Sequence, residues 1–175
     1  MNTYEILQAA KNAKACFASI DAAKKNDALA AIADSIEKHS DAILEQNRLD
    51  LEAAKGKVSD VMLDRLMLNE DRIKGMAQGI REVIELPDPT GRVLSERTIT
   101  DGLKLKKVSV PMGVIAIIYE SRPNVTSDAA ALCLKSGNVC ILRGGKEAYR
   151  TSKAITDAMR QGLSGIGLSE DLINI

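Results

Sequence analysis

Apolar residues recur at the spacing of an amphipathic helix through the first half of the chain. The stripes are Ile6, Ala10, Ala13 and Phe17; Leu29, Ile32, Ala33 and Ile36; Ile43, Leu44, Asn47 and Leu51; and Ile73, Met76, Ile80, Val83 and Ile84. Because this spacing gathers the apolar side chains on one face, residues 1–88 are predicted to form packed helices.

Capping residues and helix breakers predict where these helices begin and end. Ser40, Ser59 and Asn69 precede apolar stripes, and their side chains can accept a hydrogen bond from a free N–H at a helix start. Gly56 follows one stripe and Pro87 ends the last, since glycine suits the left-handed residue after a helix and proline cannot continue one.

The pattern changes after LPDPTG (86–91), from helical spacing to alternation. Residues 92–111 form two extended arms around Asp101 and Gly102, a pair that favours a tight hairpin turn with positive φ angles. In KLKK (104–107) lysine first alternates with leucine, so one face of the hairpin is expected to be exposed. Two adjacent lysines then break the alternation, which predicts a bulge or a bend.

The last third of the chain has the order strand, helix, strand, helix, strand. GVIAIIY (113–119) and VCIL (139–142) are continuous apolar runs, as expected of parallel strands covered on both faces. A helix with Gly137 as its stop lies between them, another helix follows, and DLINI (171–175) has the pattern of a third strand. We expect a right-handed Rossmann-like βαβαβ unit in residues 113–175, cut inside its third strand, and therefore a piece of a longer protein.

The composition is that of a globular domain and argues against several functions. Apolar residues make up 45% of the 175 residues, charged residues 27%, and the formal net charge is zero. A neutral chain has no general attraction for nucleic acid or an anionic membrane, and three tyrosines and one phenylalanine are too few for a base-stacking platform. The N-terminus lacks the basic start and unbroken apolar segment of a signal peptide, so we expect a cytoplasmic protein.

The cysteines and the histidine predict no chemistry of their own. Cys16, Cys133 and Cys140 have no metal-ligand spacing, so no metal is expected. In a reducing compartment all three are expected to be small buried hydrophobic residues, not nucleophiles. His39 is the single histidine, and its place near a helix end favours a capping or surface role.

RGGK (143–146) stands where the second buried strand meets the surface. In dinucleotide-binding folds this strand end meets the adenosine ribose, where an acidic residue favours NAD and a cation accommodates the 2′-phosphate of NADP. Arg143 and Lys146 are cations, and Gly144 and Gly145 allow a ligand to approach the backbone closely. The stretch predicts an NADP ribose-phosphate site, and an ordinary solvated turn is the alternative.

YESRPN (119–124) follows the first buried strand and lacks the glycine-rich dinucleotide fingerprint. Ser121, Arg122 and Asn124 suit an oxyanion donor or a contact with an acidic substrate. In the alternative interpretation, Ser121 or Asn124 merely caps the next helix.

The run VPMGVIAIIYESRPNVTSDAAALCLKSGNVCILRGGKEA (110–148) resembles the glutamate-5-semialdehyde dehydrogenases, or gamma-glutamyl phosphate reductases, of the aldehyde dehydrogenase superfamily. The resemblance covers essentially the whole chain, but family members are considerably longer. It implies an aldehyde dehydrogenase-like α/β fold and reduction of gamma-glutamyl phosphate by NADPH to glutamate 5-semialdehyde, on the route to proline. The superfamily's nucleophilic cysteine, which forms a thioester that hydride then reduces, lies in a later catalytic domain. No cysteine here matches its motif.

The resemblance also assigns roles by motif. Typical superfamily members have Trp-Asn-x-Pro after the first strand, where the asparagine helps to bind the oxyanion. Glu120 and Ser121 stand at the Trp and Asn positions here, and Asn124 is a rival donor. Typical members have Lys-Pro-x-Glu after the second strand, whereas Arg143 and Lys146 replace the Lys and the Glu here, which removes a carboxylate that repels a 2′-phosphate. The expected site residues are Ser121 and Asn124 as catalytic candidates, Arg122 for substrate, and Tyr119, Glu120, Arg143, Gly144, Gly145 and Lys146 for NADP(H).

The resemblance finally implies an organisation and partners. The helical part (1–88) and the incomplete cofactor unit (113–175) flank a hairpin (89–112) of the kind that pairs with a neighbouring subunit, and the catalytic cysteine domain is absent. A homo-oligomer is expected, with glutamate 5-kinase as a further partner. Two alternatives stay open: another acyl-activating aldehyde dehydrogenase relative, and a non-catalytic nucleotide-binding or assembly module. The 175-residue chain alone is expected to lack reductase activity.

Overall fold

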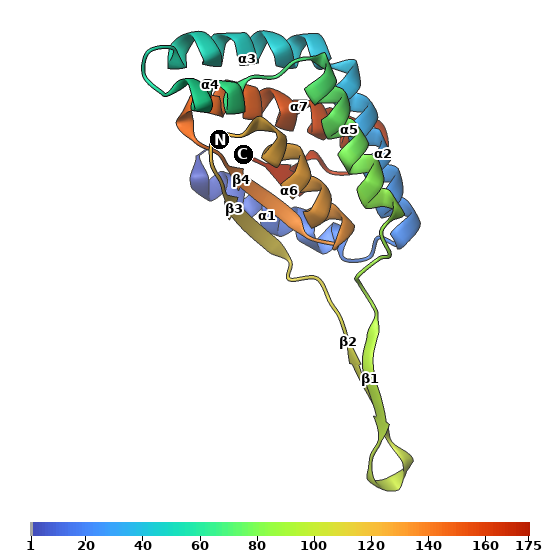
Figure 1. The fold of residues 1–175 in the computed structure, drawn as a ribbon. Helices are drawn as coiled ribbons and strands as arrows, with labels where there is room; N and C mark the ends of the chain where they lie inside the picture. Colours follow the sequence, from blue (N-terminus) through green and yellow to red (C-terminus); the bar gives the residue numbers. More distant parts are fainter. Residues whose placement is uncertain (1) are drawn as a thin grey trace.

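A computed structural model describes residues 2–175 (Figure 1). The helices of the first half are α1 (Thr3–Phe17), α2 (Ala22–Lys38), α3 (Ser40–Ala54), α4 (Asp60–Leu66) and α5 (Glu70–Glu85). A hairpin of β1 (Val93–Thr98) and β2 (Lys104–Val108) follows. The remaining elements are β3 (Val114–Ile118), α6 (Pro123–Lys135), β4 (Val139–Arg143), α7 (Tyr149–Gly165) and β5 (Ile173–Asn174).

The body of the molecule is built around a parallel sheet with the strand order β3-β4-β5. Helix α1 packs across these strands on one face, while α6 and α7 cover the other and support an outer layer of α2, α3 and α5 (Figure 1). Two successive crossovers through α6 and α7 confirm the predicted βαβαβ unit, and the expected α/β fold class is correct.

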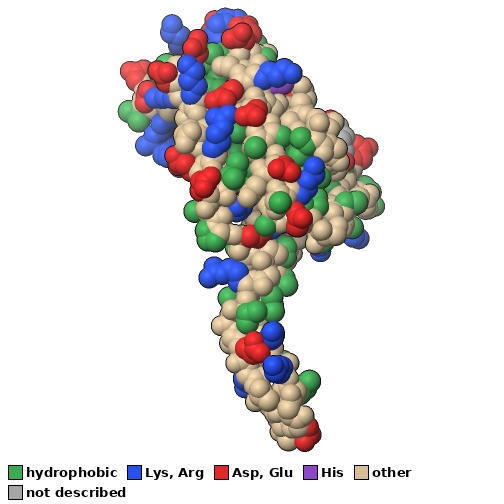
Figure 2. All heavy atoms as spheres, turned by 90° about the vertical axis from the view of Figure 1, so that its right-hand side faces the viewer, with side chains coloured by type: hydrophobic (Ala, Val, Ile, Leu, Met, Phe, Trp, Pro, Cys, Tyr) green, Lys and Arg blue, Asp and Glu red, His purple; other side chains and the backbone are tan. Residues whose placement is uncertain are grey.

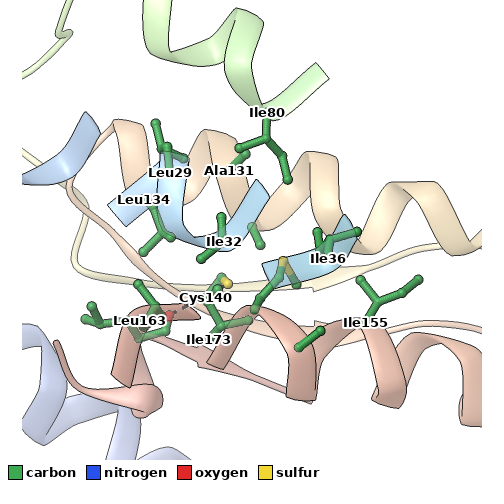
Figure 3. Close-up of a cluster of buried hydrophobic side chains, with 14 of the residues drawn as sticks. Leu29, Ile32, Ile36, Ile80, Ala131, Leu134, Cys140, Ile155, Leu163 and Ile173 are labelled. Atoms are coloured by element: carbon green, nitrogen blue, oxygen red, sulfur yellow. Dashed lines mark hydrogen bonds between the residues drawn. The ribbon is translucent and has the colours of Figure 1, made fainter. Parts of the chain in front are cut away.

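Buried aliphatic side chains from helices far apart in the sequence form the core between the sheet and the outer layer (Figure 3). Leu29, Ile32 and Ile36 of α2 meet Leu134 of α6 and Ile155 of α7, and all five are fully buried. The helical stripes predicted from the sequence therefore supply this core. Gly162 lets α7 approach α2 closely, because a Cβ at this position would lie 2.6 Å from the carbonyl oxygen of Ala31.

The prediction that β3 is covered on both faces is wrong. Ile115 and Ile117 pack against the core, whereas Val114 and Ile118 on the opposite face are exposed, Ile118 by 84%. Since β3 is an edge strand and α1 lies mainly against β4, the α1 side of β3 is left without a covering helix.

The hairpin projects from the body as a long arm (Figure 1). Asp101 and Gly102 form its turn with φ angles of 64° and 77°, which confirms the predicted turn. Both faces are exposed, not one, because nothing in the described chain packs on either strand. The bulge lies in β1, where Leu94 is the extra residue opposite the step from Lys107 to Val108.

Two expected roles need correction, and three others are confirmed. Ser59 and Asn69 cap α4 and α5 as predicted, but Ser40 is the first residue of α3 and does not cap it. Cys16 was expected to be buried, yet it is exposed, because it lies beside the apolar stripe of α1. Cys140 is buried as expected; the neighbouring Cys133 and burial raise its pKa, so it stays a protonated core thiol.

Two features are absent from residues 2–175. No helix there is both long enough and apolar enough to cross a membrane. No cluster of three or more histidine, cysteine, aspartate or glutamate side chains is arranged to hold a metal ion in that part of the chain.

We expect Gly162→Ala to destabilise the fold by about 1–3 kcal/mol, because the new methyl group meets backbone atoms that cannot move without separating α2 from α7. Urea unfolding followed by circular dichroism measures the change. Gly165→Ala in the same helix is the matched control: its Cβ meets nothing within 4 Å and should leave the stability unchanged or raise it by up to about 1 kcal/mol. Equal effects of the two substitutions would contradict the close helix contact.

Candidate functional site

The two turns singled out in the sequence are neighbours at the carboxyl edge of the parallel sheet. Ile118 at the end of β3 pairs with Arg143 at the end of β4. The backbone N–H of Tyr119 then donates to the carbonyl oxygen of Arg143 at 3.0 Å. The turns 119–122 and 143–146 therefore leave the sheet side by side, where parallel sheets of this type bind ligands.

The two glycines between Arg143 and Lys146 lie close against side chains of the neighbouring turn. A Cβ at Gly144 would lie 3.1 Å from the ring of Tyr119, and one at Gly145 would lie 1.9 Å from Oγ of Ser121. The sequence suggested that they make room for a ligand. In the structure, side chains of the neighbouring turn fill that space.

Ser121 joins the two turns through its hydroxyl group. The residue is buried, and its Oγ donates to Oε2 of Glu147 at 2.8 Å. The pKa of Glu147 is lowered by the backbone N–H of Glu147, by this hydroxyl and by the charge of Lys146. The carboxylate is thus the stable form of Glu147, a residue that sequence reasoning missed because it follows the recognised motif.

Neither Ser121 nor Asn124 caps α6. Arg122 is the N-cap residue and makes no side-chain capping bond, so the capping alternative is wrong. Asn124 is exposed in the first turn, and its Nδ2 donates to Oδ2 of Asp128 at 3.3 Å. Exposed Glu120 forms an ion pair with Arg122 at 3.5 Å.

Tyr119 is held by hydroxyl groups of the two following helices. Its Oη lies 2.8 Å from Oγ1 of Thr126 in α6, which donates to Oγ of Ser152 in α7 at 3.2 Å. Both of these partners are buried. The chain of hydroxyls fixes the ring beside Gly144.

A cleft of about 460 Å³ opens beside Lys146, between the end of α3 and the start of α7, and is called the α3–α7 cleft below. Its cations are Lys57, Lys146 and Arg150, and its anions are Asp50 and Glu147. Arg143 is exposed but does not line this cleft, so the two cations of RGGK do not share one cavity. Lys57 and Arg150 were not recognised in the sequence, because they come from segments without a motif.

A buried polar network fixes the wall of the α3–α7 cleft. Oδ2 of Asp50 accepts hydrogen bonds from the backbone N–H and the hydroxyl of Thr151, both at 2.8 Å. Asn47 donates to the carbonyl oxygen of Leu66 and accepts from the backbone N–H of Leu68, both at 2.8 Å. Asp50 therefore supplies a negative charge to the positive end of α7.

A second cleft, of about 560 Å³, lies between α5 and the start of α6 and is called the α5–α6 cleft below. Arg122 and Asn124 line it, together with Arg65 of α4 and Asp128 of α6. The two clefts lie at the start of the two helices that follow β3 and β4. One is associated with each of the turns recognised in the sequence.

We expect Ser121→Ala to raise the pKa of Glu147, because the carboxylate loses a hydrogen-bond donor. A carboxyl whose pKa is lowered by folding stabilises the fold above its unfolded-state pKa, and this contribution disappears as the pH falls through the folded-state value. The variant should therefore lose part of this acid-sensitive stability. NMR titration of the Glu147 carboxyl carbon measures the pKa, with Ser136→Ala as the control, since that hydroxyl bonds only around the end of α6. An unchanged Glu147 pKa would contradict the assigned contact.

Comparison with known proteins adds the family context. No family model matches the chain. Gamma-glutamyl phosphate reductase from Streptococcus suis (strain 05ZYH33) is 55% identical over 152 residues, which cover 87% of this chain and 37% of that protein. The protein of the same name from Streptococcus pneumoniae (strain Hungary19A-6) is 56% identical over 151 residues, covering 86% and 36%.

Solved structures agree. The crystal structure of gamma-glutamyl phosphate reductase from Thermotoga maritima superimposes with a TM-score of 0.94 at 39% identity, covering 98% of this chain and 42% of that one. The crystal structure of the Saccharomyces cerevisiae protein of that name superimposes with a TM-score of 0.87 at 36% identity. The match covers 99% of this chain and 46% of that one. A probable aldehyde dehydrogenase from Listeria monocytogenes EGD-e superimposes with a TM-score of 0.72 over 98% of this chain and 35% of that one. At 12% identity this match shows a shared fold alone.

The chain spans less than half the length of the relatives that it matches. Over that span the folds agree closely and about a third to a half of the residues are identical. The chain has an aldehyde dehydrogenase-like α/β fold and is a homologue of the gamma-glutamyl phosphate reductases.

Proposed function

We propose that the chain is the cofactor-binding part of an NADPH-dependent reductase that converts L-glutamyl 5-phosphate to L-glutamate 5-semialdehyde and phosphate in proline biosynthesis. The observation that carries the proposal is the joining of the 119–122 and 143–146 turns at one sheet edge, with a cationic cleft beside Lys146. The names of the relatives supply the substrate. The cytoplasmic setting stays a prediction.

The residues of the α3–α7 cleft fit the adenosine end of NADP(H). Three cations face two carboxylates, and one oxygen of Asp50 is already committed to Thr151, so the cleft keeps an excess of positive charge for a phosphate. Ala53, Val58 and Tyr149 supply apolar surface in the same cleft for a flat base. When bound, the nicotinamide end of the cofactor supplies the hydride.

The residues at the β3 end then have separate tasks. The Ser121 hydroxyl is committed to Glu147, which ties the two turns together, so we assign Ser121 a positioning role. Asn124 is exposed, and its amide makes only one long bond, at 3.3 Å, so it can donate to a developing oxyanion. Arg122 lies next to Asn124 on the α5–α6 cleft and can attract an acidic substrate. The nucleophilic cysteine is proposed to lie outside these residues, so the chain alone is expected to be inactive.

Exposed apolar side chains on the hairpin support a homo-oligomer of the whole protein. Leu94, Leu103 and Leu105 are exposed by 56%, 62% and 45%. Hydrophobic side chains stand between charged ones along the arm in Figure 2, and a partner strand or subunit can bury them. Association with glutamate 5-kinase is a further proposal that no feature of this surface specifies.

We expect Lys146→Glu to reverse the preference for phosphorylated dinucleotide, because a carboxylate in the α3–α7 cleft repels a 2′-phosphate. Calorimetric titration of the chain with 2′-AMP and 5′-AMP isolates this effect from catalysis. Loss of one charge-assisted contact should weaken 2′-AMP binding at least about tenfold.

Lys38→Glu is the control for the change in net charge, since Lys38 is exposed on α2 and does not line this cleft. It should leave both affinities unchanged at moderate salt. The same preference for 2′-AMP in Lys146→Glu as in the unmodified chain would refute the cofactor assignment.

A further inference from the structure

The α5–α6 cleft presents both signs of charge. Its cations are Arg65, Arg72 and Arg122, and its carboxylates are Asp64 and Asp128. Arg72 and Asp64 are committed to each other at 3.1 Å, and Arg72 also donates to two carbonyl oxygens near the end of α4 at 2.6 Å. Three charged groups are therefore left to face the cleft.

These three groups lack strong partners. Within residues 2–175, Arg65 makes no hydrogen bond or ion pair, and Arg122 has only its 3.5 Å contact with Glu120. Asp128 accepts one long bond from Asn124, and partial burial raises its pKa although the side chain is open to the cleft. A carboxylate and guanidinium groups thus share a cavity without neutralising each other.

Gly75 keeps one wall of the cleft open. It lies inside α5, where glycine costs about 0.5–1 kcal/mol relative to alanine, and its φ angle is not positive. A Cβ there would meet nothing within 4 Å, so contacts among the described residues do not explain the glycine. The missing side chain leaves open space in the cleft wall.

We propose that the α5–α6 cleft binds the amino-acid head group of the substrate, with Asp128 accepting the α-ammonium group and Arg65 and Arg122 binding the α-carboxylate. This rests on the proposed function and adds the residues that distinguish a glutamyl group from a simple dicarboxylate. A site for phosphate alone needs no carboxylate, whereas a zwitterion needs both charges. The cleft has the size of small-ligand sites, and Asn124, the proposed oxyanion donor, also lines it.

NMR titration of the 175-residue chain tests the proposal, with the Gly75 and Gly79 amides as reporters. The probes are L-glutamate, glutarate, which lacks the ammonium group, and 4-aminobutyrate, which lacks the α-carboxylate. L-glutamate should shift both reporters, and each incomplete probe should bind at least about tenfold more weakly, since one charged contact is lost.

Asp128→Asn should remove the preference for L-glutamate over glutarate, whereas Asp27→Asn on exposed α2 should preserve it. Gly75→Leu should fill the cleft and block binding, while Gly75→Ala should raise the unfolding midpoint and so confirm that the position tolerates a side chain in the fold.

Equal binding of L-glutamate and glutarate, or no reporter shifts with L-glutamate, would overturn the head-group site. The result is separable from the proposed function. If 2′-AMP binding depends on Lys146 but L-glutamate does not bind here, only the head-group site fails. If L-glutamate binds here while 2′-AMP shows no preference, the cofactor assignment fails alone.

Discussion

The parallel register of β3 and β4 is the constraint on which the candidate site depends. Pairing of Ile118 with Arg143 brings Tyr119 over Gly144 and Ser121 against Gly145. A slip of the strands by one residue would move the two turns past each other and separate these contacts. In the observed register the hydroxyl chain from Tyr119 and the bond from Ser121 to Glu147 both form, so strand pairing and local packing support each other.

Much of the fold follows from patterns within short segments. Helical stripes, caps such as Ser59 and the Asp101–Gly102 turn are local, and the structure confirms them. The sequence-based predictions failed where the exposure of a residue depends on which element of the fold packs against it. A continuous apolar run is the same in an edge strand and in a central one, so the sequence wrongly predicted that β3 is covered on both faces. Cys16 was wrongly predicted to be buried because it is adjacent to the apolar stripe of α1 without belonging to it.

The site was predictable only in part, for a related reason. Strand ends of a parallel sheet must meet at one edge, so the neighbourhood of the two turns could be expected. The contact of Asp50 with Thr151 joins residues 101 positions apart, and no motif marks either residue. The glycine pair shows a different limit: the sequence correctly marks positions where little room is left for a side chain, but it does not tell whether protein or ligand fills the space.

The carboxylate of Asp50 at the start of α7 has a consequence for selectivity. Helix N-termini commonly attract phosphate through their free N–H groups and the helix dipole. Here the buried carboxylate of Asp50 already provides a negative charge at the start of α7, and it accepts a hydrogen bond from the backbone N–H of Thr151. Discrimination among anionic ligands in this cleft is thereby left to exposed surface cations, whose attraction weakens over a Debye length of about 8 Å at physiological ionic strength. Ionic strength, more than backbone geometry, would then set how strongly this cleft distinguishes one anionic ligand from another.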